Sequence, residues 1–424
     1  MRIIEKVIAN DLCTSCGTCE GVCPNNAINM TINKKGIFIP IIDYESCSNC
    51  GLCDAVCPGL KIDFNKLRSS LLDNQSQNKL HKNNSHQFTG YASDKNIRKK
   101  GQSGGIVSAL LIYAIENSII DGVICTRWKK KNPLLPEVFI AKTKTEILSA
   151  TGSKYCPVPI NVILKKINHI NGKFAYIGLP CQMEGLRKYE MINNEINKKI
   201  ILHLGLFCDR TLSFHFQSYI LKLLNINNDE LGHFIYRNKN WKGWPGDIQV
   251  VKKNHEKLNV SKDYRIYVKS FFTPWRCHLC IDKLNLLSDI AIGDAWLKEF
   301  SNKKDGVNLV ICNTEKGREI LEAARKDGEI YINKISSEKI NIAQSPIKKK
   351  QEFDIFCQIS NVMGREIPKY NIKFNYDNRK FKTKNFIFSL LNLIITRLIS
   401  YNLPRKLFQK IPIRFLKAYS LILK

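Results

Sequence analysis

Between about residues 100 and 340, the chain alternates short apolar runs with stretches whose apolar positions recur every three or four residues. The apolar runs predict buried strands, and they cover residues 121–128, 172–180, 199–209, 288–296 and 307–313. The periodic stretches predict helices over 104–117, 182–196 and 314–328, the last with Thr314 as its N-cap. Strands joined by single helices indicate right-handed crossovers, so we expect an α/β core with a mainly parallel sheet.

The segments that flank this core have other patterns. Residues 67–87 are polar and rich in Asn, Ser and Gln, which predicts a linker. Residues 385–401 predict an apolar helix with a narrow polar stripe made of Ser389, Asn392, Thr396 and Ser400. This helix is shorter than the roughly 20 residues that span a bilayer. We expect it to pack on its own domain or on a second subunit, and the alternative is a helix lying on an anionic membrane surface.

Length and charge narrow the picture. A chain of 424 residues with 44% apolar residues is large enough for two or three domains. The net charge of +29 is uneven: residues 1–62 carry five Lys/Arg and six Asp/Glu, whereas residues 365–424 carry fourteen and two. Such a charge favours an acidic protein, a phosphorylated cofactor, nucleic acid or a membrane as partner. The alternative is a compositional bias that places lysines on solvated faces.

The cysteines carry the strongest chemical signal. The chain has sixteen, and its first residues lack a secretory cleavage site, so we expect a cytoplasmic protein with metal or redox chemistry. Two copies of C-x2-C-x2-C-x3-C-P match bacterial two-cluster ferredoxins, in which the fourth cysteine of each copy serves the other cluster. One 4Fe–4S cluster is therefore assigned to Cys13, Cys16, Cys19 and Cys57, and the other to Cys47, Cys50, Cys53 and Cys23. Zinc is the disfavoured alternative.

Four further cysteines are predicted to meet at one sheet edge. Cys181 and Cys208 follow two strands that one crossover joins, so both are expected at the carboxyl edge of the sheet. Cys277 and Cys280 form a Cys-x-x-Cys turn that could join them. The spacing alone leaves four alternatives open: a third 4Fe–4S cluster, zinc, a redox dithiol, or buried cysteines beside an unrelated pair.

Three loops could bind anionic or planar groups. The turn at residues 101–105 (GQSGG) precedes a helix and could form an anion-binding nest, or be an ordinary capped turn. Residues 151–157 (TGSKYCP) could hold a planar anionic cofactor, or be a surface loop. The aromatic and basic stretch 236–247 has the composition of a single-strand nucleic-acid surface, but the lining of a substrate cleft is the favoured prediction.

Taken together, GQSGGIVSALL, TGSKY, YIGLPCQMEGLRK, LFCD, CHLC and SDIAIGDAW resemble the coenzyme F-420 hydrogenase/dehydrogenase beta-subunit family, with a two-cluster ferredoxin module in front. The resemblance covers roughly residues 90–330 and implies a flavoprotein that binds FAD beside a third 4Fe–4S cluster. It implies that Cys181, Cys208, Cys277 and Cys280 hold that cluster. It also implies flavin contacts from Gly101, Gln102, Ser103, Gly104, Gly105, Gly152, Ser153, Lys154, Tyr155, Gly293 and Asp294. Lys154 is the candidate for a catalytic cation.

The cysteine repeat, the composition and the resemblance together predict five segments. They are a ferredoxin domain (1–62), a polar linker (63–89), N- and C-terminal beta-subunit regions (90–165 and 166–345) and a basic amphipathic tail (346–424).

The expected function is an oxidoreductase that relays electrons between ferredoxin or coenzyme F420 and a small organic substrate, in polysaccharide or cofactor metabolism. The alternatives are a non-catalytic electron-transfer subunit and a basic binding protein with structural clusters. Substrate identity does not follow, because family members reduce substrates as different as a deazaflavin coenzyme and tetrapyrrole-type pigments.

Overall fold

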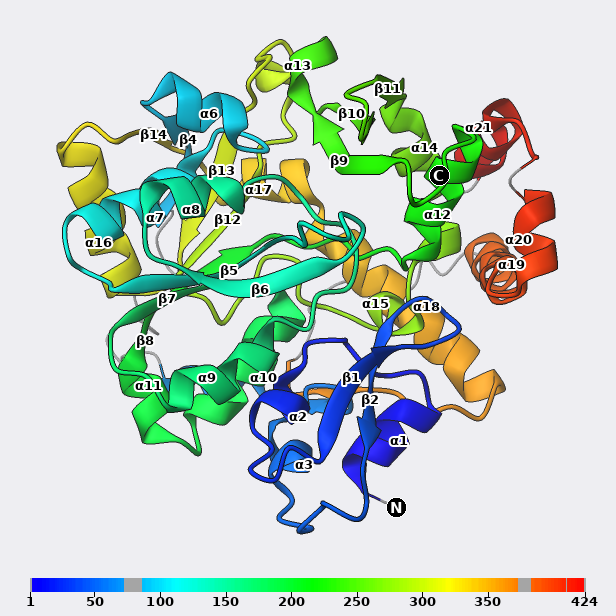
Figure 1. Cartoon of the computed structure of the whole chain (residues 1–424), viewed down its shortest axis with the longest axis horizontal. Coiled ribbons are helices and arrows are strands. Elements are labelled where there is room, and N and C mark those ends of the chain that lie inside the picture. Colours follow the sequence, from blue (N-terminus) through cyan, green and yellow to red (C-terminus); the bar gives the residue numbers. More distant parts are fainter. Residues whose placement is uncertain (1, 72–85, 373–382, 409, 423–424) are drawn as a thin grey trace.

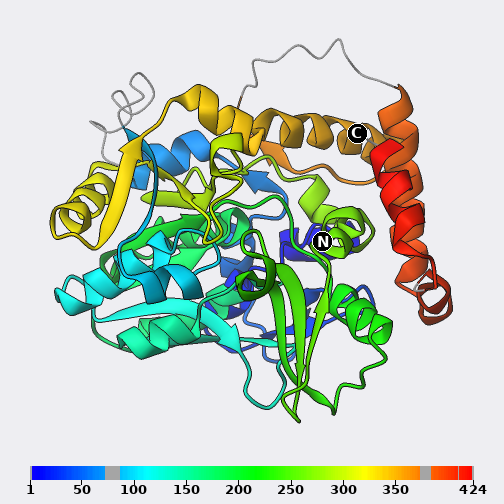
Figure 2. The same cartoon turned by 90° about the horizontal axis from the view of Figure 1, so that it is seen from above.

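The computed structural model describes residues 2–71, 86–372, 383–408 and 410–422. An N-terminal module that carries the ferredoxin-type repeat lies beneath a larger core, and helices from the C-terminal region lie at one edge of the molecule (Figure 1). Seen from above, the C-terminal helices again lie at one edge of the molecule (Figure 2).

An eight-stranded sheet forms the centre of the core. Its order is β14-β4-β13-β12-β8-β7-β5-β6, and β12, β8, β7 and β5 run parallel. The strands are β4 (Gln87–Ala92), β5 (Gly122–Trp128), β6 (Pro136–Ala141), β7 (Phe174–Gly178), β8 (Ile200–Leu206), β12 (Ile290–Asp294), β13 (Asn308–Cys312) and β14 (Ile330–Lys334). The expected parallel arrangement holds for these four central strands, but the sheet is mixed because its other four pairings are antiparallel.

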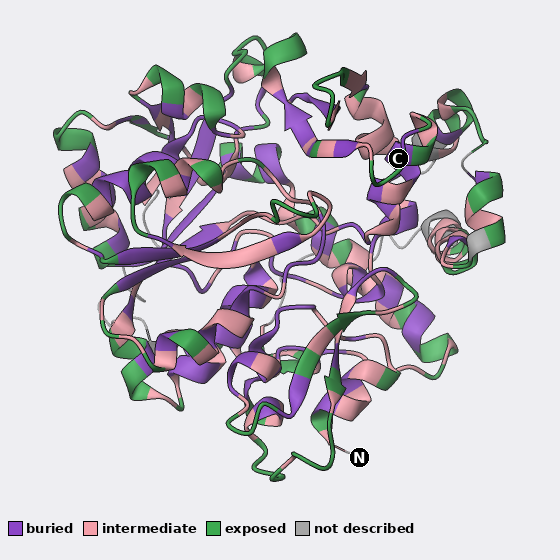
Figure 3. Cartoon of the chain, viewed as in Figure 1, coloured by how far each residue is buried: buried purple, intermediate pink, exposed green. Residues whose placement is uncertain are grey.

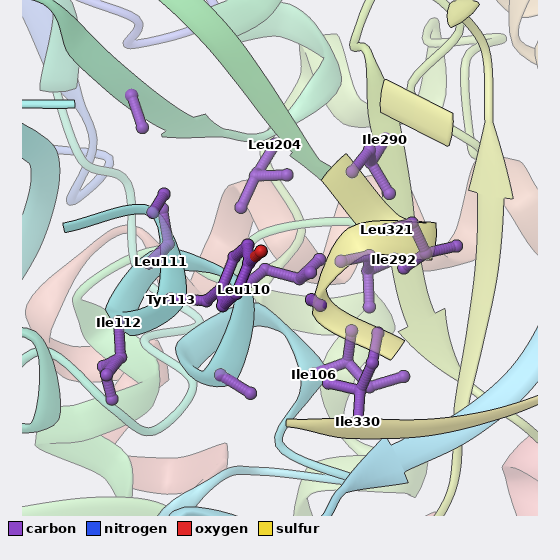
Figure 4. Packing of buried hydrophobic residues seen from close by; sticks show 14 of the residues in the cluster. Ile106, Leu110, Leu111, Ile112, Tyr113, Leu204, Ile290, Ile292, Leu321 and Ile330 are labelled. Atoms are coloured by element: carbon purple, nitrogen blue, oxygen red, sulfur yellow. The ribbon is translucent and has the colours of Figure 1, made fainter. Parts of the chain in front are cut away.

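Helices cover both faces of this sheet. On one face lie α6 (Lys95–Lys100), α7 (Ile106–Glu116), α8 (Lys144–Ser149) and α16 (Glu315–Lys326). Leu110 and Leu111 of α7 and Leu321 of α16 belong to one buried cluster with strand residues (Figure 4). The predicted cap is confirmed, since the hydroxyl of Thr314 accepts from the amide of Gly317 at 3.1 Å. The central strands are buried along most of their length (Figure 3).

The opposite face is covered by η2 (Ile160–Ile163), α9 (Leu164–Asn168), α10 (Pro180–Glu190) and α11 (Asn194–Lys199). The single helix expected over 182–196 is in fact two helices. The side chain of Asn193 accepts from the amide of Ile196 and so starts α11 as a separate helix.

A second sheet lies above the carboxyl edge of the first. It is antiparallel and consists of β9 (Leu231–Asn238), β10 (Asp247–Lys252) and β11 (Lys257–Val260). Short helical segments lie around it: α12 (His215–Leu223), α13 (Lys239–Lys242), α14 (Lys262–Tyr267) and the 3₁₀ turn η3 (Lys269–Phe272). Helix α15 (Trp275–His278) follows η3 in the chain. A further short turn, η4 (Lys298–Phe300), follows β12. The sequence pattern did not predict this sheet.

The N-terminal module packs against η2, α9 and α10. It contains α1 (Ile3–Ala9), α2 (Thr18–Gly21), the antiparallel hairpin β1–β2 (Ile28–Ile32 and Phe38–Ile42), α3 (Leu52–Val56), β3 (Lys61–Ile62) and α4 (Phe64–Leu71). The predicted linker at 63–89 is therefore too long at both ends. Its start is helix α4, where Phe64 and Leu67 are buried, and its end lies in β4. Residues 72–85 lie outside the described part of the chain.

The predicted C-terminal tail is also structured where it is described. It follows α17 (Ser337–Gln344) and contains α18 (Pro346–Val362), β15 (Lys369–Tyr370), α19 (Thr383–Ile399), α20 (Asn402–Phe408) and α21 (Ile413–Ile422). β15 pairs with β3 of the N-terminal module, so residues 346–372 are part of the body. Among the described residues, no helix combines the length and hydropathy needed to cross a membrane.

Candidate functional site

A cavity of about 860 Å³ lies at the carboxyl ends of the central parallel strands. Strands β5, β7, β8 and β12 contribute Cys125, Gly178, Leu206 and Gly293 to its wall. The opposite wall comes from the three-stranded sheet and the helix after it. The carboxyl edge of an open α/β sheet is where cofactors commonly bind, and the volume suits a large organic ligand.

Two of the three loops singled out in the sequence, residues 101–105 and 151–157, meet at this cavity. Side chain Gln102 joins them, because its Oε1 accepts from the Ser153 amide at 2.9 Å and its Nε2 donates to the carbonyl of Arg237 at 2.9 Å. Gly105 has φ +84° at the start of α7, a conformation that favours glycine. All residues predicted from these loops line the cavity except Gly104, which packs against Gly90 and Asn308.

Lys154 lines the cavity but its ammonium is held by its own loop. The Nζ atom donates to the carbonyls of Ala150 at 3.0 Å and Gly152 at 3.1 Å. Burial lowers the pKa of Lys154 to about 8. Lys154 therefore loses its charge at a lower pH than an exposed lysine does.

Asp294 is tied to a neighbouring cation. The guanidinium of Arg237 donates to both Asp294 oxygens, at 2.8 and 3.0 Å, and the Trp244 indole donates to Oδ1 at 2.7 Å. Burial alone would raise the pKa of Asp294, but the adjacent Arg237 lowers it. The same guanidinium lies 3.3 Å from the hydroxyl of Tyr155, and the pKa of Tyr155 is lowered by Arg237 and Arg265 against the opposing effect of burial.

The sequence-predicted set of four later cysteines is brought together beside this cavity. Cys181 starts helix α10, Cys208 follows β8, and Cys277 and Cys280 belong to the turn at α15. Burial and then Glu184, Cys208 and Cys280 raise the pKa of Cys181, while Cys277 and Cys280 contribute to the raised pKa of Cys208. Cys208 also lines the cavity, so these four cysteines adjoin it. They are called the third set below, after the two groups of the N-terminal repeat.

The third set contains no disulfide. All four cysteines are free thiols. In the described part of the chain, no three His, Cys, Asp or Glu side chains lie close enough to share one metal ion.

Buried cations surround the third set. Lys349 of α18 is 4% exposed, and its Nζ donates to the carbonyl of Asp209, directly after Cys208. Arg276, next to Cys277, donates to the carbonyls of Leu279 at 2.8 Å, Gly59 at 3.2 Å and Pro58 at 3.3 Å. Because Pro58 follows Cys57, Arg276 links the third set to the N-terminal module.

The eight cysteines of the N-terminal module form two groups with the predicted partition. Burial and then Cys16 raise the pKa of Cys57 to about 12, and Cys13, Cys16 and Cys57 all act on Cys19. The other group surrounds a cavity of about 140 Å³, which is lined by Cys23, Cys47, Cys50 and Cys53 together with Arg2. Cys50 is exposed, so this group lies near the surface.

The inner group of the module is fixed to the core by buried polar contacts. Asn161 is fully buried, and its backbone amide donates to the carbonyl of Cys16 at 3.0 Å. Its Nδ2 donates to Thr18 Oγ1 and to the carbonyl of Gln182, both at 2.8 Å. Since Gln182 directly follows Cys181, one asparagine holds the inner group and the third set in a fixed relation.

Sequence reasoning missed several residues of the site. Arg237, Trp244 and Pro245 line the cavity, which agrees with the cleft-lining prediction for 236–247. That stretch gave no reason, however, to select Arg237 as the partner of Asp294. Lys349 and Arg276 were missed because nothing near them in sequence indicates a charged site.

Comparison with known proteins supports the same division of the chain. Residues 87–165 and 171–338 match the models for the N-terminal and C-terminal parts of the coenzyme F420 hydrogenase/dehydrogenase beta subunit. Residues 12–59 match a 4Fe-4S dicluster domain.

Relatives of the chain occur in Methanococcus voltae and Methanocaldococcus jannaschii. The chain is 30% identical over 253 residues to the coenzyme F420 hydrogenase subunit beta of Methanococcus voltae, covering 58% of this chain and 78% of the relative. It is 24% identical over 369 residues to the coenzyme F420-dependent sulfite reductase of Methanocaldococcus jannaschii, covering 82% of this chain and 52% of that enzyme.

A solved structure shares the fold. A chain of the F420-reducing [NiFe] hydrogenase complex from Methanosarcina barkeri matches with a TM-score of 0.53 and 25% identity, over 66% of this chain and 94% of that chain. The matched segments, the mixed sheet and the cavity at its carboxyl edge lead to one conclusion: the chain belongs to the coenzyme F420 hydrogenase/dehydrogenase beta-subunit family and carries a 4Fe-4S dicluster domain in front of it.

Proposed function

We propose that this protein is an iron–sulfur flavoprotein oxidoreductase that relays electrons between an external carrier and a small organic substrate. One observation carries the proposal: three cysteine sets form a continuous path from the surface to the cavity. The path runs from the group with exposed Cys50, through the group with Cys16, to the third set, whose Cys208 lines the cavity.

Each cysteine set suits one 4Fe–4S cluster. Cys47, Cys50, Cys53 and Cys23 would hold the outer cluster, Cys13, Cys16, Cys19 and Cys57 the inner one, and Cys181, Cys208, Cys277 and Cys280 the third. The grouping of the cysteines supports this assignment, because Cys13, Cys16 and Cys57 lie close enough to act on Cys19, and Cys208 and Cys280 close enough to act on Cys181. Arg276 and Lys349 would balance part of the charge of the third centre.

The cavity suits FAD. The turn Gly101–Gly105 at the start of α7 offers amides and a helix N-terminus for the pyrophosphate. The loop Gly152–Tyr155 and the wall residues Gly293 and Asp294 would flank the remainder. FAD would couple the one-electron transfer of the clusters to the two-electron reduction or oxidation of the substrate.

Two observations indicate the external partner: the net charge of the chain and the names of its relatives. Several relatives are named for coenzyme F420, and the chain carries a net charge of +29. An acidic ferredoxin or the deazaflavin coenzyme itself would therefore be attracted electrostatically. A place in polysaccharide or cofactor metabolism remains part of this proposal.

Cofactor content of anaerobically purified protein tests the proposal. We expect about twelve irons, from three clusters of four, and about one FAD per chain. Iron, acid-labile sulfide and flavin would be quantified on the same sample. About eight irons would remove the third cluster, and absence of FAD after reconstitution would remove the flavin.

A second candidate function is an electron-transfer subunit that leaves catalysis to a partner. It is favoured by the matching chain of a hydrogenase complex, of which this chain covers 94%. Turnover of an artificial donor with coenzyme F420 or another acceptor by the isolated protein supports the oxidoreductase. Cofactor-loaded protein that transfers electrons only after a partner is added supports the subunit.

Lys154 gives a pH-dependent prediction. Since burial lowers the pKa of Lys154 to about 8 in the absence of added charge, reduction of a flavin to its anionic form should raise that pKa. Reduction would then take up a proton above pH 8, so the flavin midpoint potential should fall more steeply with pH from about 8 upward.

The variant Lys154→Met should lose this additional slope and have a lower potential below pH 8. Anaerobic potentiometric titration of both proteins measures the effect. A range from about pH 6.5 to about pH 9.5 extends on both sides of the Lys154 pKa of about 8. Equal potentials and slopes in the two proteins would exclude Lys154 from the flavin site.

A further inference from the structure

The outward face of helix α19 is apolar. Its exposed side chains are spaced by four, three and four residues and therefore form one stripe along the helix. The stripe consists of Ile387, Leu391, Ile394 and Leu398, which are 51%, 42%, 48% and 49% exposed. A helix that borders water normally presents polar side chains there.

The polar side chains of α19 instead lie toward the body. Thr396 Oγ1 donates to the carbonyl of Asn392 at 2.8 Å and is 3.4 Å from that of Ser270, while Ser400 donates to the carbonyl of Thr396 at 3.0 Å. These residues are only partly exposed. The helix therefore has an amphipathic pattern that is reversed relative to a water-facing helix.

Helices α20 and α21 extend this apolar face. They and the turns beside them expose further large side chains: Tyr401, Leu403, Leu407, Ile411 and Phe415. Ile399, Phe408 and Leu416 are buried in one cluster with Tyr219 and neighbouring aromatic residues, which fixes the helices on the body. The three helices lie at the edge of the molecule in both views (Figures 1 and 2).

The segment that forms this face carries charge of a single sign. Residues 378–424 contain eleven Lys and Arg and no Asp or Glu. Arg397, Lys406, Lys410, Arg414 and Lys417 are exposed. The surface thus combines exposed aliphatic and aromatic groups with cations, and its occupant must be both apolar and anionic.

We infer that α19–α21 dock this protein on the surface of an anionic phospholipid bilayer. The apolar side chains enter the boundary between headgroups and acyl chains, while the cations contact phosphates. Lysine is depleted in protein–protein interfaces, and its abundance here favours lipid over an acidic protein. The inference is independent of the cofactors and of the redox function.

Vesicle flotation of the full chain tests this inference. Anaerobically purified protein is mixed with vesicles of phosphatidylcholine alone or with phosphatidylglycerol added. We expect flotation only with the anionic vesicles, and we expect it to decrease as NaCl is raised. The variant Lys406→Gln/Lys410→Gln/Lys417→Gln should bind roughly fivefold more weakly for each lost charge, about 100-fold in total.

Apolar variants provide the second arm. Ile387→Gln/Ile394→Gln/Leu398→Gln keeps good helix formers and should weaken binding at least about tenfold. Ile192→Gln/Ile342→Gln, at positions 52% and 62% exposed elsewhere on the body, is the matched control and should bind as the unmodified protein does.

Absence of flotation, equal flotation with neutral vesicles, or unchanged binding of both triple variants would overturn the inference. An oligomer in size-exclusion chromatography that the apolar variant converts to monomer, without vesicle binding, would assign the face to a protein interface and would also overturn it.

Discussion

Replacement of Cys181 by serine should remove about four of about twelve irons and abolish substrate turnover to below about 1% of the unmodified rate. Cys181 belongs to the cysteine set between the N-terminal module and the cavity. Without a cluster there, the proposed path from the inner group to the cavity would be interrupted. The clusters of the N-terminal module use cysteines of a separate unit and should persist.

Iron analysis and EPR of the dithionite-reduced protein measure these effects together. The two ferredoxin-type signals should remain, while the signal of a third cluster is lost. Cys357→Ser is the matched control, because Cys357 is a partly buried cysteine of α18 outside the three sets. It should retain all irons and full turnover. Twelve irons in Cys181→Ser would show that this cysteine ligates no cluster.

The parts of this site that were predictable follow local rules. Motif spacing separates Cys57 from its own copy of the repeat and assigns it to the cluster of Cys13, and the structure groups those residues in the same way. The parallel neighbours β7 and β8 follow from a right-handed crossover. That rule places Cys181 and Cys208 at one sheet edge without knowledge of the rest of the fold.

The missed parts depend on contacts between distant residues. Strand β4 lies between β13 and β14, where Phe88 pairs with Val310 and Gly90 with Ile332. These partners are more than 200 residues away in the sequence, so nothing in the sequence around β4 indicates the pairing. The polar sequence before it suggested a linker instead. In the same way, Lys349 reaches the third cysteine set only because α18 crosses the body, so its sequence neighbours indicate an ordinary basic helix.

The predicted start of the basic tail, at residue 346, was wrong because it relied on amino-acid composition. The basic residues after about 346 indicated a separate tail, yet Phe356 and Ile359 of α18 are buried against Trp275 and Leu279 beside the third set. A basic segment belongs to the core when one face of its helix is buried, and the net charge of the segment does not indicate whether that face is buried.

The variant Arg237→Leu should destabilise the protein by about 3–5 kcal/mol at neutral pH, since it leaves the Asp294 carboxylate without its cation. The Arg237 side chain is 2% exposed and that of Asp294 is 17% exposed, so water cannot fully replace the lost contact. The exposed pair Arg318–Glu315 supplies the matched control, and Arg318→Leu should cost less than about 1 kcal/mol. Anaerobic urea unfolding of the full chain, followed by tryptophan fluorescence, measures both.

The pH dependence of the same variant identifies the cause. In the unmodified protein, Arg237 lowers the pKa of Asp294, so this pair stabilises the fold above the unfolded pKa of about 3.9 and ceases to do so as pH falls through the lower folded value. In Arg237→Leu the folded pKa of Asp294 should rise, because burial is then opposed mainly by the hydrogen bonds from Trp244 and Ser103. The stability deficit should therefore shrink as pH falls from 7 toward about 4. Arg237→Leu/Asp294→Asn should recover most of the loss at neutral pH, since it removes the unpaired charge as well. A double variant no more stable than Arg237→Leu, with a deficit that does not change with pH, would show that the loss comes from packing at Arg237 rather than from its ion pair.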